Sequence, residues 1–157
     1  MIRIYLDNCV YNRLYDYVEV SDEGDNLFDV LQMDHEKRAV LKIINRIKSG
    51  IYDGAYSFMS EYENNRNPFE YKRSEILKFL HYCKIYVPYD VKALLQDKII
   101  SFMNNYNLHY QDAVHLACAV YADCDYLLTV DKRFINAYKG SEINIINPID
   151  LEPEGDI

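Results

Sequence analysis

The sequence predicts a single three-layer α/β/α domain built around a central parallel sheet. Short apolar segments alternate with longer amphipathic segments from end to end, and no low-complexity linker or internal repeat interrupts them. The length of 157 residues lies within the usual range of one domain. Because a helical segment follows almost every strand, the strands should be parallel and helices should cover both faces of the sheet.

The expected strands are rich in β-branched and aromatic residues and lie at 2–6, within 52–59, and at 84–87, 126–130 and 143–146. The first helix should run to residue 49, with a stripe at Val40, Leu41, Ile43, Ile44 and Ile47, and should stop at Gly50. An acidic loop around residues 21–26 should precede that helix. The other helices are expected from Ser60 and over 69–82, 91–106, 111–122 and 132–138. The domain should span residues 1–147, followed by a loose acidic tail at 148–157.

The composition narrows the class of protein. The net charge of −8 argues against a protein that holds nucleic acid on a broad basic surface. No apolar run approaches the roughly 20 residues needed to cross a bilayer, and the N-terminus lacks the features of a signal peptide. We therefore expect a cytoplasmic protein with no membrane partner. The 16 tyrosines are spread along the whole chain and mark no particular site.

Four carboxylates fall where a parallel sheet binds its ligands, at the carboxyl ends of its strands. Asp7 directly follows the first expected strand and Asp131 follows the fourth. Glu63 lies in the first turn of the helix after strand two, and Asp112 opens the helix at 111–122. Four like charges in one cleft repel one another and need a compensating cation. Hard carboxylate ligands favour Mg²⁺ or Mn²⁺.

Each acid also has a purely structural interpretation. An Asp after a strand often caps a helix, and Asp112 could favour a helix start through the macrodipole. Ser60 and Glu63 have the spacing of a capping box. A zinc site using His115, Cys118 and Cys124 is disfavoured, because the spacing matches none of the common zinc patterns.

Two other phosphoryl-transfer classes place Asp at strand ends and fit less well. A haloacid dehalogenase needs a second Asp two residues after Asp7, where this chain has Cys9. A receiver domain needs an acidic pair near the first strand as well as a late Lys, and only the Lys, at Lys132, could be proposed here.

In the motifs it carries, and in their order along the sequence, the chain resembles PIN-domain proteins. These include the ribonuclease toxins of bacterial toxin–antitoxin pairs. The resemblance covers nearly the whole chain, from Ile2 to about Asn147. Its motifs are an apolar strand ending in Asp7, a hydroxyl residue three before a Glu (Ser60 and Glu63), Asp112-Ala113 before a small apolar helix, and Thr129-Val130-Asp131-Lys132-Arg133-Phe134 after an apolar strand.

The resemblance implies a metal-dependent endoribonuclease that hydrolyses phosphodiester bonds and leaves a 5′-phosphate. It assigns Asp7, Glu63, Asp112 and Asp131 as catalytic metal ligands holding Mg²⁺ or Mn²⁺. Thr129, Asn8 and Ser60 would support them, and Glu61 is a rival to Glu63. Arg13, Lys132 and Arg133 are the candidates to steer a phosphate, whereas His109 and His115 are interpreted as structural.

The same resemblance implies the partners. These are an RNA substrate, an antitoxin-like protein if the chain is the toxin of a pair, and a second copy in a homodimer. The alternative is a catalytically silent PIN-like module that binds RNA or a protein without cutting. Such modules usually lose acids from the quartet, and this chain keeps all four.

Overall fold

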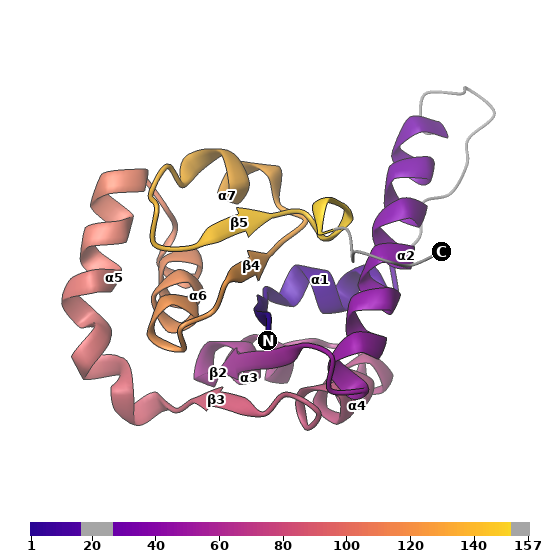
Figure 1. Cartoon of the computed structure of the whole chain (residues 1–157), viewed down its shortest axis with the longest axis horizontal. Helices are drawn as coiled ribbons and strands as arrows, with labels where there is room; N and C mark the ends of the chain where they lie inside the picture. The colour runs from indigo at the N-terminus through magenta and orange to yellow at the C-terminus, as the bar shows by residue number, and fades with distance from the viewer. Residues whose placement is uncertain (17–26, 152–157) are drawn as a thin grey trace.

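The computed structural model describes residues 1–16 and 27–151, which form a sheet of five parallel strands flanked by helices (Figure 1). The strands are β1 (Arg3–Leu6), β2 (Asp53–Ser57), β3 (Ile85–Val87), β4 (Tyr126–Leu128) and β5 (Asn144–Ile146). Their order across the sheet is β3-β2-β1-β4-β5, and every neighbouring pair is parallel. Each of these strands lies within a segment expected from the sequence.

The helices connect these strands in chain order. They are α1 (Asn8–Arg13), α2 (Leu27–Lys48), α3 (Phe58–Asn65), α4 (Glu70–Leu80), α5 (Lys92–Tyr106), α6 (Tyr110–Tyr121) and α7 (Lys132–Ala137), with 3₁₀ turns η1 (Tyr89–Val91) and η2 (Pro148–Asp150). The elements expected from the sequence did not include α1. None of the described helices has the length and apolar character that a membrane crossing needs.

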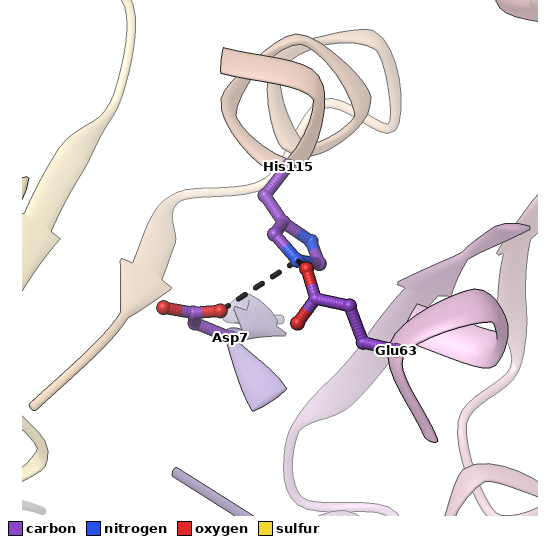
Figure 2. Close-up of side chains that lie close together, drawn as sticks. All are labelled: Asp7, Glu63 and His115. Carbon is purple, nitrogen blue, oxygen red and sulfur yellow. Dashed lines mark hydrogen bonds and ion pairs between the residues drawn. The ribbon is translucent and has the colours of Figure 1, made fainter. Parts of the chain in front are cut away.

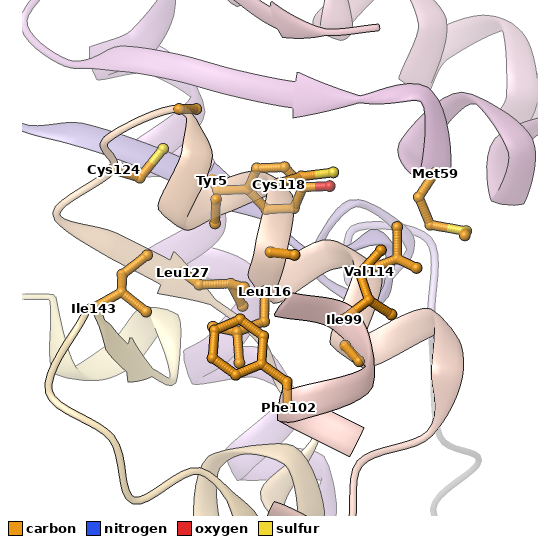
Figure 3. Packing of buried hydrophobic residues seen from close by; sticks show 14 of the residues in the cluster. Tyr5, Met59, Ile99, Phe102, Val114, Leu116, Cys118, Cys124, Leu127 and Ile143 are labelled. Atoms are coloured by element: carbon orange, nitrogen blue, oxygen red, sulfur yellow. The ribbon is translucent and has the colours of Figure 1, made fainter. Parts of the chain in front are cut away.

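The alternation of side chains in β1 divides the interior into two cores, one on each face of the sheet. Ile4 and Leu6 pack with residues of α1, α2 and α4. Tyr5 points to the opposite face and packs with residues of α5 and α6, such as Ile99 and Leu116 (Figure 3). The three-layer α/β/α architecture with a central parallel sheet is therefore confirmed.

The long helix α2 buries a narrower stripe than expected. Val40, Ile43, Ile44 and Ile47 are buried, but Leu41 is 50% exposed. Gly50 ends this region with a φ of +79°, a left-handed conformation that suits glycine after a helix, so the expected stop is confirmed. The acidic loop expected around residues 21–26 lies outside the described residues.

The packed part of the chain continues past residue 147. Pro148–Asp150 forms η2, which packs on α2, and Leu151 is buried in the same core as Ile4. Asn147 caps this turn, because its side chain accepts a hydrogen bond from the backbone of Ile149. The tail expected to begin at residue 148 is thus ordered at least through Leu151, and residues 152–157 are outside the described chain.

The start of α3 differs from the expected capping box. Ser57, and not Ser60, is the N-cap, and its Oγ accepts a hydrogen bond from the backbone N of Met59. Ser60 is the third residue of the helix, where its Oγ accepts from the Ser57 backbone N at 3.1 Å. The capping box predicted for Ser60 and Glu63 is therefore wrong by three residues. Glu63 lies in the second turn of α3 and has no capping role.

Candidate active site

The candidate site lies at the carboxyl end of the sheet, between β1 and β4. From β1 the chain proceeds to β2 and β3 on one side, whereas β4 and β5 lie on the other. This reversal point is where ligands bind in open α/β sheets. Asp7 directly follows β1, and its backbone N continues the ladder by donating to the Leu128 carbonyl at 3.0 Å. The Asp7 residue is 7% exposed.

Two side chains hold the Asp7 carboxylate in place. Oδ2 accepts hydrogen bonds from Thr129 Oγ1 at 2.9 Å and from Cys9 Sγ at 3.3 Å. Burial, and then the charge of Asp7, raise the pKa of Cys9 well above its usual value, so the thiol keeps the proton that it donates. With Oδ2 occupied in this way, the other oxygen, Oδ1, faces the rest of the site.

Glu63 and His115 approach Asp7 from α3 and α6 (Figure 2). His115 Nε2 lies 2.7 Å from Glu63 Oε1 and 3.6 Å from Asp7 Oδ1. One potential ligand atom from each of the three side chains lies within 4.8 Å of the other two. Three segments that are distant in the sequence therefore place two carboxylates and an imidazole around one point.

The other nitrogen of His115 is fixed from inside the core. Nδ1 lies 2.6 Å from the hydroxyl of Tyr5, which also lies 2.6 Å from Ser57 Oγ and 3.2 Å from Ser60 Oγ. The residues that make these hydrogen bonds inside the core are completely buried: Tyr5, Ser57, Ser60 and His115. Tyr5 and the two serines thus orient the imidazole, and the imidazole orients Glu63.

The environment raises the pKa of His115 above its usual value. Burial by itself lowers this pKa, but the hydrogen bond to the Glu63 carboxylate and the charges of Asp7, Glu63 and Asp112 outweigh it. A proton on the ring is therefore stabilised by these neighbours. In its protonated form the ring adds a positive charge between the carboxylates, and in its neutral form it offers a nitrogen ligand.

Asp112 is the third residue of α6, one helical turn before His115. Its carboxyl is partly buried, and its pKa is raised from 3.8 to about 6. Burial is the largest cause and the charge of Asp7 the next, with Asp131 adding a smaller effect in the same direction. Asp112 is thus close enough for the charges of Asp7 and Asp131 to act on it.

Asp131 lies at the same edge of the sheet but on its surface. Its backbone N donates to Thr129 Oγ1 at 3.1 Å, which links it to the hydroxyl that holds Asp7. Its side chain is exposed and caps α7, with Oδ1 accepting from the Arg133 backbone N at 2.9 Å. The structure therefore brings Asp7 and Glu63 into direct proximity, with Asp112 beside them and Asp131 at the rim.

Comparison with known proteins adds a structural likeness. No protein-family model matches the chain, and no curated protein matches its sequence. A chain from the crystal structure of FitAcB from Neisseria gonorrhoeae superposes with a TM-score of 0.56 and 15% sequence identity, over 94% of this chain and 99% of that one. FitB is a PIN-domain toxin.

The chain has the PIN-domain fold. The parallel sheet order and the flanking helices agree with that likeness along nearly the entire chain. At 15% identity the likeness establishes the fold alone. The residues of the site must therefore carry any argument about activity.

Within this PIN fold, the structure separates Glu63 from its rival Glu61. Glu63 contacts His115, whereas Glu61 is a hydrogen-bond partner of Tyr86 on β3. Partial burial, together with that hydrogen bond, raises the pKa of Tyr86 to about 12. Of the two acids, Glu63 is the one that faces Asp7.

The three basic residues expected to steer a phosphate lie in different surroundings. Arg13 is engaged by acids, with an ion pair to Asp16 at 3.1 Å and another to Glu36 at 3.4 Å. Lys132 and Arg133 are exposed on α7 beside Asp131, and Arg133 contacts the ring of His109. Arg13 is thus occupied inside the fold, while the α7 pair stays at the rim of the site.

The donor set fits a divalent cation. Asp7 and Glu63 offer hard oxygen ligands, which Mg²⁺ and Mn²⁺ prefer, and a neutral His115 would add a nitrogen, which Mn²⁺ accepts more readily than Mg²⁺. The Asp7 carboxylate is held by neighbouring hydrogen bonds, as ligating carboxylates usually are. Among the described residues, this is the group of side chains placed to hold an ion.

Sequence reasoning missed two members of this site, His115 and Tyr5. A histidine inside the apolar run of α6 has the appearance of a core residue, and a strand tyrosine has the appearance of core packing. One signal was available: His115 follows Asp112 by three residues, which places both on one helix face. Tyr5 and Asp7 are two residues apart in extended chain, so their side chains point to the same face of the sheet.

Proposed function

We propose that this chain is a metal-dependent endoribonuclease that hydrolyses phosphodiester bonds in RNA. One observation carries the proposal: Asp7, Glu63 and His115 each present a potential ligand atom within 4.8 Å of the other two, at the ligand-binding edge of a PIN fold. Asp112 supports it, because a carboxyl whose pKa is raised by burial and by Asp7 belongs to the same electrostatic cluster.

In this proposal Asp7, Glu63, Asp112 and Asp131 form the acidic site, and the cofactor is Mg²⁺ or Mn²⁺. Asp7 and Glu63 would hold the ion directly, since they are the two carboxylates of the group whose ligand atoms lie within 4.8 Å of one another. When bound, a divalent cation supplies the positive charge that activates water and stabilises the leaving oxygen of a phosphodiester. Asp112, on α6, and Asp131, at the rim, would add negative charge to the site.

The chain's own residues keep this site in a single geometry. Thr129 and Cys9 fix one oxygen of Asp7 and leave the other facing the ion position. Tyr5 holds His115 from the core side, and His115 holds Glu63. Since these partners are buried, the carboxylates are preorganised before substrate arrives.

The experiment is a cleavage assay on single-stranded RNA with Mn²⁺, Mg²⁺ or EDTA. We expect cleavage with Mn²⁺ or Mg²⁺, no cleavage in EDTA, and a loss of activity in Asp7→Asn and Glu63→Gln while both variants stay folded. Asp97→Asn, at an exposed position on α5, is the matched control and should cut normally. Metal-independent cleavage, or full activity in Asp7→Asn, would contradict the proposal.

We also propose that the chain acts as the toxin of a toxin–antitoxin pair, with an antitoxin-like protein and a second copy of itself as partners. The support is the likeness to FitAcB over 94% of the chain. Expression of the wild type should stop bacterial growth, and expression of Asp7→Asn should not. Equal growth in both strains, with active protein present, would leave the nuclease proposal intact and remove the toxin role.

A further inference from the structure

A groove leads away from the acidic site between α1, α3 and the turn before α4. Its volume is about 320 Å³, and both Asn8 and Glu63 line its inner end. Its outer end is lined by Arg66, Phe69 and Lys72. The volume lies within the range of small-molecule pockets. A ligand seated there would therefore adjoin the candidate active site.

Asn8 leaves an acceptor without a partner at the inner end of this groove. The residue is only 6% exposed, and its Nδ2 donates to the Ser60 carbonyl at 3.3 Å. A carbonyl can only accept, so this bond fixes the orientation of the amide. The opposite atom, Oδ1, is buried and has no hydrogen-bond partner. An unsatisfied buried acceptor is costly, and a ligand hydroxyl that enters beside Asn8, with a small displacement of the atoms that cover Oδ1, would satisfy it.

The outer end of the groove carries an exposed aromatic ring and two cations. Phe69 is 58% exposed, and Lys72 Nζ lies 4.6 Å from the centre of its ring. Arg66 lies over the ring of Tyr62 and donates to its hydroxyl at 2.6 Å. Exposed rings next to cations are the elements with which proteins bind single-stranded nucleic acid, through base stacking and phosphate contacts.

The turn that presents Phe69 is held by Asn67. The Asn67 amide donates to Asn12 on α1 at 3.1 Å, and its Oδ1 accepts from the Phe69 backbone N at 3.1 Å. Arg73 donates to the Asn67 carbonyl at 2.6 Å. The ring is thus positioned before a ligand binds, which reduces the entropy lost on binding.

Two acids also line the groove, and each contacts another side chain of the domain. Glu63 contacts His115, and Asp16 pairs with Arg13 at 3.1 Å. The charge of Asp16 is therefore partly neutralised by Arg13, and Arg66 and Lys72 add positive charge to the lining of the groove. A phosphate can approach this lining despite the net charge of the chain.

We propose that this groove binds the nucleotide next to the scissile phosphate and selects RNA over DNA. The ribose 2′-hydroxyl donates to Asn8 Oδ1, the base stacks on Phe69, and Arg66 and Lys72 bind the phosphate beyond it. The 2′-hydroxyl is the donor that DNA lacks, so Asn8 reads the sugar. This inference rests on the proposed nuclease function and adds the substrate preference and the residues that impose it.

The test measures binding and cleavage separately on the intact chain. Fluorescence anisotropy with Ca²⁺ in place of Mn²⁺ compares a short single-stranded RNA, the same sequence as DNA, and its 2′-O-methyl form. We expect RNA to bind about threefold to tenfold more tightly than either analogue, the effect of one neutral hydrogen bond. Asn8→Ala should weaken binding of RNA and leave binding of DNA unchanged.

Phe69 is tested in the same assay. Phe69→Ala should lower affinity by roughly tenfold, within the range for loss of one base–aromatic stack. Phe69→Tyr should retain affinity, because the ring is kept. Phe28→Ala is the matched control, since Phe28 is also an exposed phenylalanine, 74% accessible, but lies on α2 outside the groove.

The outcomes separate this inference from the nuclease proposal. Equal affinity for RNA, DNA and 2′-O-methyl RNA, or equal effects of Phe69→Ala and Phe28→Ala, overturns the groove assignment even if the wild type cuts RNA with Mn²⁺. The expected binding pattern without cleavage in Mn²⁺ or Mg²⁺ overturns the nuclease proposal and supports the groove. If Asn8→Ala does not fold, the 2′-O-methyl comparison decides the role of the sugar with the wild-type protein.

Discussion

Replacing Asp112 with Asn should stabilise the metal-free protein. The Asp112 carboxyl is partly buried and lies in the field of Asp7, and for these reasons its pKa rises from 3.8 to about 6. Above that pH the folded protein carries a carboxylate that its surroundings disfavour. Asn has nearly the same shape and no charge, so the variant avoids this unfavourable interaction.

The size of the effect follows from the shift. A rise of roughly two units corresponds to about 3 kcal/mol at the upper limit, at 1.36 kcal/mol per unit. Because the group is only partly buried, water screens much of this energy, and we expect about 1 kcal/mol. For a domain of this size that raises the melting temperature by roughly 2–4 °C.

The direction of this pKa shift also determines how stability changes with pH. With its pKa raised in the folded state, Asp112 binds a proton more tightly when the protein is folded than when it is unfolded. Wild-type stability therefore falls as pH rises from about 4 to about 6, and the loss is complete above the folded pKa. The advantage of Asp112→Asn should be absent near pH 4 and reach its full value by pH 7.

The assay is a series of thermal melts in EDTA from pH 4 to pH 8, with Asp97→Asn on the exposed face of α5 as the control. In Mn²⁺ the order should reverse, because the ion stabilises the wild type by binding its carboxylates. A difference between Asp112→Asn and wild type that does not change with pH would refute the electrostatic reasoning. Destabilisation of Asp112→Asn at pH 7 in EDTA would refute it as well.

Three further outcomes follow from the same contacts. Millimolar Mn²⁺ should raise the melting temperature of the wild type and not of Asp7→Asn, and an equal rise in both would place the ion elsewhere. Ser57→Ala should lower stability by about 0.5–2 kcal/mol through loss of the α3 cap, whereas Glu63→Gln should leave it nearly unchanged and weaken Mn²⁺ binding. Melts and calorimetric titrations of both variants check this, and a stability loss in Glu63→Gln equal to that of Ser57→Ala would contradict it. Tyr5→Phe should cost about 1–3 kcal/mol in denaturant melts, because it removes a hydroxyl from the buried His115 ring; a variant as stable as wild type would show that this contact is unimportant.

The sheet was predictable from the sequence because its strands are short apolar segments with a helical segment between most of them. Segments 84–87 and 143–146, for example, contain β3 and β5 to within one residue. The short helix α1 was not predictable in the same way. It has six residues, several of low helix propensity, and no side-chain cap, so its formation depends on burying Val10 and Tyr11 against α2 and α4.

The placement of Glu63 shows the limit of local pattern reading. The spacing of Ser60 and Glu63 matches a capping box, but the helix begins at Phe58 because Ser57 is the residue in extended conformation whose Oγ reaches the Met59 backbone N. The sequence allows the helix to start after either Ser57 or Ser60. The choice depends on Ser57 and Ser60 also meeting the Tyr5 hydroxyl, a contact across 52 and 55 residues that a local motif cannot show.

His115 changes the charge balance expected for four neighbouring acids. The structure places its imidazole 2.7 Å from Glu63 and 3.6 Å from Asp7. The surrounding charges raise the pKa of His115, and the ring in its protonated form supplies part of the positive charge from within the protein. The fold can therefore keep Asp7 and Glu63 together before any ion binds. Asp112 also feels the charge of His115, but burial and the charge of Asp7 outweigh it and raise the pKa of Asp112, so an added cation would relieve repulsion there.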